Sequence, residues 1–274
     1  MSTPTYQTIK VVTRPKGGTA SVTGVDFQSL PTTQLREIFK ALANCQVLEF
    51  PDSRLNPEQQ LALTRGLCEV SGTSVENVGI TEITNQGEYG DYELDWHADS
   101  YFEGTGPKVG ILNAVTLPSR AVNTRYCDMT NLWKDVPAGI QRELRGKFIC
   151  NDTVYTQYGR PRGQSKPMTE DFRKWPHVQH PVVHRDPDTG KESLYLGARK
   201  WAFIKDMDQS RSNDILEELW KMVDSGRYTF ETEWKEGMLG MWRNDLVLHY
   251  RPKGHGEPRL LHRTSVPGQA LIMA

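Results

Sequence analysis

The segment from Leu94 to Ser100 contains two side chains, His97 and Asp99, that could hold a metal ion. On an extended strand, residues two apart point to the same face, so this imidazole and this carboxylate could meet one ion. Nonheme iron oxygenases use two histidines and one carboxylate on one face of an octahedron, and leave the other positions for substrates. A His-x-Asp pair also arises by chance in a chain with seven histidines. The pair therefore predicts a metal site only together with a distant third ligand.

A second segment, Trp242 to Tyr250, is strand-like and contains His249 next to its end, and two arginines follow it. In the extended sequence around them, alternation puts Arg259 and Arg263 on the same face of a strand. Removing an unpaired cation from water is costly. Two guanidinium groups on one side of a strand therefore predict anions beside them.

These segments together resemble the taurine dioxygenase-like family of Fe(II)- and 2-oxoglutarate-dependent oxygenases. The resemblance covers most of the chain and rests on the order and spacing of several motifs. They are Gly24-Val25-Asp26, Trp96 to Phe102, Leu117 to Ser119, His180 to Val183, Asp186 to Lys191 and Leu260 to Arg263. The resemblance implies that His97 and Asp99 are the proximal metal ligands and that His249 is the distal one.

The family resemblance also implies the cofactors Fe(II), 2-oxoglutarate and O2. Thr124 and Arg259 match positions that bind 2-oxoglutarate, and a guanidinium fork suits its C5 carboxylate. Arg263 is then left for an anionic group of the prime substrate. The expected reaction is oxidation, hydroxylation by default, of a small anionic or amino-acid-like molecule, with release of succinate and CO2. The chemistry is centred on iron, and no side chain is assigned as a separate acid or base.

Four further residues are predicted to contact the prime substrate. Phe102 lies three residues past Asp99, and Glu93 would suit a substrate that also carries an amine. Trp201 follows a strand where the family places substrate-facing residues, although plain packing explains it equally well. Asn113 interrupts an apolar strand, and its buried amide needs partners, which are either the cosubstrate or neighbouring backbone.

Several outcomes and functions stay open at this stage. Desaturation, cyclisation and C–S or C–O cleavage need the same cofactors as hydroxylation. Halogenation is disfavoured, because family halogenases replace the carboxylate ligand with a small residue and Asp99 is present here. A zinc hydrolase could use the same three ligands but would not explain Thr124 and the arginines. A noncatalytic jelly-roll sensor could keep the cavity without turnover.

The remaining histidines, tryptophans and cysteines fit structural roles better than chemical ones. His177, His180 and His184 flank prolines and a strand, where alternation separates them, so a second metal site is not expected. Trp242 is expected in the core. The four cysteines are far apart, form no Cys-x-x-Cys motif and are expected to be reduced packing residues.

The arrangement of elements predicts an α+β chain with a double-stranded β-helix, or jelly-roll, core and helices packed outside. The strands do not alternate with helices as βαβ units. The predicted elements are strands at Ile9–Thr13, Cys45–Phe50 and Val109–Leu117, a hairpin turning at Asp186–Gly190, a helix with Leu35–Leu42, a helix capped by Asn56, a helix at Asn213–Asp224 ended by Gly226, and three short strands after it. The Pro/Gly/Arg-rich segment Tyr158–Pro167 is expected to be a long loop, and whether it is a lid stays open.

Length and composition fit one domain spanning residues 1–274. Lys plus Arg (33) and Asp plus Glu (34) nearly cancel, so nucleic acid is not an expected partner. No apolar run is long enough to span a membrane, and the first residues lack a signal-peptide pattern, so the cytoplasm is the expected location. The expected partner is a small-molecule substrate, and the sequence leaves open whether the chain forms a homo-oligomer.

Overall fold

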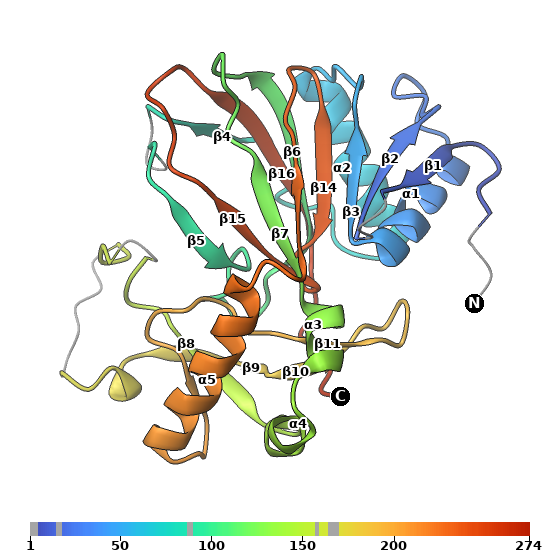
Figure 1. The fold of residues 1–274 in the computed structure, drawn as a ribbon. Helices are drawn as coiled ribbons and strands as arrows, with labels where there is room; N and C mark the ends of the chain where they lie inside the picture. The colour runs from blue at the N-terminus through green and yellow to red at the C-terminus, as the bar shows by residue number, and fades with distance from the viewer. Residues whose placement is uncertain (1–4, 15–17, 87–89, 157–158, 164–169) are drawn as a thin grey trace.

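Two facing β-sheets form the upper half of the molecule in the computed structural model (Figure 1), which describes residues 5–14, 18–86, 90–156, 159–163 and 170–274. The seven-stranded sheet consists, in order, of β1 (Lys10–Thr13), β2 (Thr19–Thr23), β3 (Val47–Phe50), β14 (Leu239–Arg243), β6 (Pro107–Thr116), β16 (Leu260–Pro267) and β4 (Thr81–Thr84). The four-stranded sheet consists of β13 (Thr229–Thr232), β7 (Thr124–Asp128), β15 (Val247–Arg251) and β5 (Leu94–His97). Neighbouring strands pair antiparallel except β2 and β3, which are parallel. This arrangement confirms the predicted jelly-roll architecture.

Two helices, α1 (Thr32–Cys45) and α2 (Pro57–Ser71), pack beside the seven-stranded sheet (Figure 1). The predicted Asn56 cap is present: its side chain accepts from the Gln59 backbone N–H while the Gln59 side chain accepts from the Asn56 N–H. Such a capping box satisfies backbone donors that a helix start otherwise leaves unpaired. Of the predicted inward residues, Ile38, Leu42, Leu63 and Leu67 are fully buried against the sheet, whereas Phe39 is only partly buried.

The lower half holds the remaining elements (Figure 1). They are α3 (Met129–Asp135), α4 (Ala138–Leu144), β8 (Phe148–Asp152), a 3₁₀ turn (Phe172–Lys174), β9 (His177–Pro181), β10 (Val183–Arg185), β11 (Glu192–Leu194), β12 (Phe203–Ile204) and α5 (Gln209–Asp224). A second core forms here, in which residues of α5 such as Ile215 and Leu219 pack in one cluster with Trp96 and Leu248 of the four-stranded sheet. All four cysteines are free and buried, as predicted.

After α5 and before β8, the observed elements differ from the sequence prediction. Four strands follow α5, rather than three, because β13 to β16 are all distinct elements. The short helices α3 and α4 were not predicted, since seven residues each are too few for a clear apolar period. The predicted loop at 158–167 falls partly outside the described residues, which here include only 159–163. In the described part of the chain, no helix is long and apolar enough to cross a membrane.

A buried arginine joins the two halves. Arg243, at the end of β14, is 1% exposed and donates to Asp186 at 2.6 Å, Asp188 at 2.9 Å and Asp245 at 2.7 Å. Asp186 and Asp188 lie in the turn between β10 and β11. Burial alone would raise the pKa of Asp186, but the Arg243 guanidinium outweighs it, and the net shift is downward. A cation placed among three carboxylates holds this turn against the upper sheet.

We predict that Arg243→Met lowers the free energy of unfolding by about 3 to 5 kcal/mol, because the carboxylates keep their burial and lose their counter-charge. Urea unfolding followed by far-UV circular dichroism measures the change. Arg227→Met is the control, because Arg227 is 71% exposed and pairs with Asp135 at the surface. Equal losses in the two variants would contradict the role given to Arg243.

Candidate active site

Three predicted residues, His97, Asp99 and His249, come together on the four-stranded sheet. The register of β15 with β5 sets His249 opposite His97, and the centroids of their rings are 4.1 Å apart. Asp99 lies in the turn just after β5, so the predicted strand ends at His97 rather than running through both ligands. One donor atom from each residue lies within 4.8 Å of the other two. Two imidazoles and one carboxylate in this arrangement form a donor set that suits Fe(II).

The two imidazoles present their Nε2 atoms to one oxygen of Asp99. Oδ1 of Asp99 lies 3.6 Å from Nε2 of His249 and 3.9 Å from Nε2 of His97. Nδ1 of His97 lies 2.8 Å from the carbonyl oxygen of Asp95, which orients the ring with Nε2 toward Asp99. Burial lowers the pKa of His97, and burial, followed by the unfavourable proximity of a second protonated imidazole at His97, lowers that of His249 to about 3. Both rings are therefore neutral at pH 7, as a metal ligand requires.

The second oxygen of Asp99 has a separate partner. Nη2 of Arg263 donates to Oδ2 at 2.8 Å, while Oδ1 faces the imidazoles. Burial alone would raise the pKa of Asp99, but Arg263, followed by His249 and His97, lowers it to about 2. The carboxylate is thus ionised. Its Oδ1 faces the two histidines, and its Oδ2 binds Arg263.

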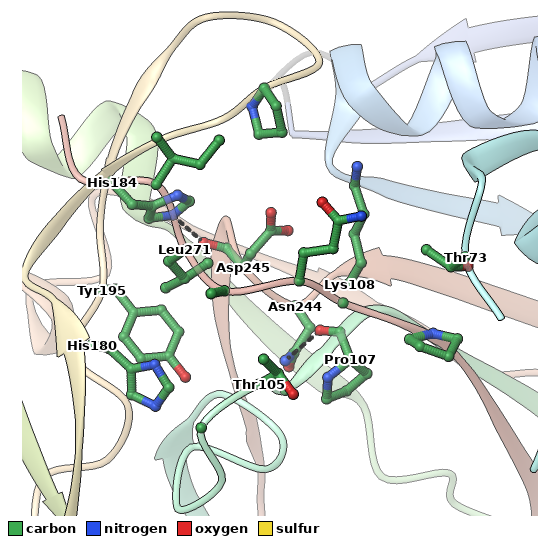
Figure 2. Close-up of a pocket in the computed structure, with 18 of the residues that line it drawn as sticks. Thr73, Thr105, Pro107, Lys108, His180, His184, Tyr195, Asn244, Asp245 and Leu271 are labelled. Atoms are coloured by element: carbon green, nitrogen blue, oxygen red, sulfur yellow. Dashed lines mark hydrogen bonds between the residues drawn. The ribbon is translucent and has the colours of Figure 1, made fainter.

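The backbone of Asp99 is held by Asn244, in the turn between β14 and β15. Its Oδ1 accepts from the Asp99 N–H at 2.7 Å, and its Nδ2 donates to the Asp99 carbonyl at 3.1 Å. Nδ2 also donates to the Pro107 carbonyl at 3.0 Å, as Figure 2 shows. The side-chain amide of Asn244 therefore binds both the backbone N–H and the backbone carbonyl of Asp99. Sequence reasoning missed this residue, because its partners are 145 and 137 positions away.

Trp242 packs against the site from the neighbouring sheet. Its ring centroid is 5.2 Å from that of His249, and the side chain is 2% exposed, which agrees with its predicted core position. The ring lies directly over Gly110 of β6, where an added Cβ would be 2.1 Å from it. Glycine at position 110 thus allows the tryptophan to lie flat on β6 and support His249.

A cavity of about 490 Å³ opens in front of the triad. Thr124, Arg259, Arg263 and Phe102 all line it, as predicted, and Leu261 lies with the two arginines on the face that strand alternation gives. Arg259 is 8% exposed, and Oγ1 of Thr124 accepts a hydrogen bond from Nε1 of Trp234 at 2.9 Å. The cavity therefore combines a possible metal site with buried hydrogen-bonding and cationic groups.

Glu93 does not reach this cavity, which corrects its prediction as a substrate contact. The pairing of β5 with β15 contains a bulge, because three steps along β5 match two along β15. An extra residue shifts the alternation, so Leu94 faces the cavity and Glu93 does not. Glu93 lies with Tyr250 at another surface. There burial, then a hydrogen bond to Glu93, raises the pKa of Tyr250 to about 12.

Trp201 and Asn113 also lie outside the described lining of the metal cavity. Trp201 has a left-handed backbone, with φ 55°, and packs in an aromatic cluster, 4.8 Å from Tyr155 and 5.8 Å from Trp175. On β6 it is Leu112 that faces the cavity, so the adjacent Asn113 points to the other side of the sheet. Its Nδ2 donates to the Leu55 carbonyl at 2.9 Å. Of the two predicted partners for this amide, cosubstrate or backbone, the structure therefore has the backbone.

The three histidines of the lower half do not form a cluster with metal-ligand geometry among the described residues. Nε2 of His180 lies 3.2 Å from the Tyr101 carbonyl, and Nε2 of His184 lies 2.7 Å from that of Asp245. His184 and Asn244 line a smaller cavity of about 90 Å³, separate from the lining of the metal cavity (Figure 2). The His180 and His184 rings therefore both lie within hydrogen-bond distance of backbone carbonyls.

Sequence reasoning also missed the arginines on the segment after β8. Arg160 and Arg162 both line the metal cavity, and Arg162 lies face-on to Phe102, with its Cζ 3.4 Å from the ring centroid. The sequence signal was present as the Arg-x-Arg of an expected loop, but nothing in it indicated which surface this loop covers.

Comparison with known proteins places this geometry in a family. The family model described as "Taurine catabolism dioxygenase TauD, TfdA family" matches residues 12–265. The 2,4-dichlorophenoxyacetate dioxygenase of Cupriavidus pinatubonensis is 24% identical over 84% of this chain and 87% of its own length. The alkylsulfatase of Acinetobacter baylyi is 25% identical over 91% of this chain and 82% of its own.

Solved structures agree on the fold. AAD-2 in complex with Mn(II) and N-oxalylglycine has a TM-score of 0.80, with 23% identity over 97% of this chain and 99% of that one. A taurine dioxygenase from Burkholderia xenovorans has a TM-score of 0.78, with 21% identity over 97% and 93% of the two chains. The chain therefore belongs to the TauD/TfdA family, and it is a nonheme iron dioxygenase that uses Fe(II), 2-oxoglutarate and O2.

Proposed function

We propose that this chain hydroxylates a small organic anion, with His97, Asp99 and His249 as the iron ligands. The observation that carries the proposal is the convergence of these three donors on the wall of a cavity rich in arginine. Among the residues that the structure describes, five arginines but only two carboxylates, Asp99 and Glu103, line it. A cavity with this excess of positive charge favours anionic ligands.

Two groups of cavity residues would have different roles, one in binding 2-oxoglutarate and the other in binding iron. Arg259 and Thr124 would hold 2-oxoglutarate, through a guanidinium fork on its C5 carboxylate and a hydroxyl hydrogen bond. Apolar side chains such as Leu112 and Leu261 line the space between and limit water near the triad. Iron bound by the triad would supply O2 activation and oxidation of a substrate C–H bond.

The cosubstrates and the substrate class are tested together by succinate release. The relatives are named for 2,4-dichlorophenoxyacetate and alkyl sulfates, so phenoxyacetate, an alkyl sulfate and taurine form a suitable first panel. Release that requires Fe(II), 2-oxoglutarate and O2 together supports the proposal. Substrate conversion without 2-oxoglutarate would indicate a zinc hydrolase, and binding without O2 consumption would indicate a sensor.

We predict that His249→Ala abolishes the metal-to-ligand charge-transfer band that anaerobic Fe(II) and 2-oxoglutarate give in the green region. The chelate needs iron held by three protein ligands with adjacent free positions. The band is read by absorption spectroscopy. His255→Ala, at an exposed position outside the described cavity lining, is the control and should keep the band. An unchanged band in His249→Ala would remove His249 from the ligand set.

We predict that Arg259→Leu raises the 2-oxoglutarate concentration for half-maximal succinate release about ten- to a hundredfold. A charge-assisted bidentate contact contributes about 1.5 to 3 kcal/mol. The shift should be the same for every prime substrate, because the cosubstrate is common to all. Arg120→Leu, at an exposed surface position, should leave the requirement unchanged. A substrate-dependent shift in Arg259→Leu would argue that Arg259 binds the prime substrate instead.

We predict that Asn244→Ala weakens metal binding about ten- to a hundredfold, because a partner that orients a ligand typically contributes this much. The substitution removes the two hydrogen bonds that hold the Asp99 backbone, while His97, Asp99 and His249 are all still present in the chain. Titration with Co(II), followed by its absorption spectrum, measures the affinity without turnover. Asn131→Ala is the control, since Asn131 donates to Asp128, which is not part of the metal cavity lining. A folded Asn244→Ala variant with unchanged affinity would refute the role.

A further inference from the structure

A buried tryptophan, Trp234, is hydrogen-bonded to the threonine that is assigned above to 2-oxoglutarate. Trp234 lies between β13 and β14, is 5% exposed and lines the metal cavity together with Thr124. Its Nε1–H donates to Oγ1 of Thr124 at 2.9 Å, and this hydrogen bond is buried. The two residues are 110 positions apart in the sequence, so the fold alone brings them together.

The direction of this hydrogen bond is set by the two groups themselves. An indole nitrogen can only donate, whereas a hydroxyl has one hydrogen to donate and two lone pairs that accept. Oγ1 of Thr124 must therefore accept from Trp234, which occupies one of its lone pairs. The hydroxyl hydrogen is left to point away from the indole.

That hydrogen has no acceptor among the described residues, where the bond from Trp234 is the only hydrogen bond of the Thr124 side chain. Thr232 lies opposite Thr124 on β13, but its buried hydroxyl has no partner, so it does not accept from Thr124. Arg259 lines the same cavity and has only donors. The Thr124 hydrogen is therefore available to a ligand that brings an acceptor, such as a carboxylate oxygen.

The indole ring is held in place by the sheet behind it. It lies against the backbone of β14 at Gly240, where an added Cβ would be 2.7 Å from Cη2 of the ring. Met238 and Leu261 pack with it in one buried cluster. The indole N–H is thus directed at Thr124 before any ligand binds, and a group ordered in advance loses less conformational entropy on binding.

We propose that Trp234 is a positioning residue for the cosubstrate, because it orients the Thr124 hydroxyl to donate to 2-oxoglutarate. This inference rests on the proposed function, in which Thr124 and Arg259 bind the cosubstrate. Without the indole N–H, the hydroxyl rotates among its staggered positions, and its hydrogen is directed elsewhere for part of the time. The bond that Oγ1 accepts also polarises the hydroxyl and strengthens the bond that it donates.

The test is a double-mutant cycle on 2-oxoglutarate affinity, measured anaerobically from the charge-transfer band of the Fe(II)-loaded protein. We expect Trp234→Phe to weaken 2-oxoglutarate about three- to tenfold, because much of one hydrogen bond is lost. Thr124→Val removes the hydroxyl and keeps the shape of the side chain. In that background Trp234→Phe should weaken 2-oxoglutarate no further, because the group through which Trp234 acts is absent. In a Thr124→Ser background, which keeps a hydroxyl, the loss should return.

Two controls separate this role from general effects on the fold. Trp133→Phe should leave 2-oxoglutarate affinity unchanged, because Trp133 is 3% exposed and donates to Glu192 at 3.1 Å but is outside the described cavity lining. Co(II) binding without 2-oxoglutarate should be equal in Trp234→Phe and the wild type. Far-UV circular dichroism checks folding, and Trp234→Leu takes the place of Trp234→Phe in the cycle if the latter does not fold.

Either of two results overturns the assignment. One is unchanged 2-oxoglutarate affinity in the folded Trp234→Phe variant. The other is an equal loss with Thr124 and with Thr124→Val, which would show that Trp234 acts by packing and not through the hydroxyl. Failure of the proposed function is seen separately, because then the wild type gives neither the charge-transfer band nor 2-oxoglutarate-dependent succinate release.

Discussion

The pairing of β15 with β5 is the constraint on which the metal site depends. It sets His249 directly opposite His97, so two imidazoles from strands about 150 residues apart in sequence share one face. A slip of one residue would turn one ring to the opposite face of the sheet and leave no second nitrogen for the metal. Trp242 supports this register from the facing sheet, because its ring lies between Gly110 and His249.

Two adjacent residues link this register to the rest of the molecule. Arg243 binds carboxylates of the β10–β11 turn, and Asn244 binds the backbone of Asp99. Both lie where β14 turns into β15, the strand that carries His249. Asp99 is therefore positioned relative to the two histidines by a turn that a buried ion cluster holds in place. Fold stability and ligand geometry are coupled through one short segment.

The sequence predicted the parts of the site that follow regular periodicity. Alternation correctly put Arg259 and Arg263 on one face, because the strand there is extended. The placements of Glu93 and Trp201 beside the substrate were wrong, because a bulge in β5 turns Glu93 away from the cavity and Trp201, with a left-handed backbone, packs in an aromatic cluster. The position of Asn244 beside Asp99 and that of Arg162 on the cavity wall were not predicted, because both come from contacts between distant segments, which no local pattern reports.

Some residues that line the cavity lie on strands of the two sheets, and others lie on the segment after β8. The triad histidines lie on strands held by ladders of backbone hydrogen bonds, and Arg259 directly precedes β16. Arg162 lies on a short segment held by its bond to Val154 and by its own side-chain contacts. Residues on such segments can change with little effect on the sheets, since few ladder bonds depend on them. The described residues 159–163 can therefore change while the strands that carry the two histidines keep their geometry.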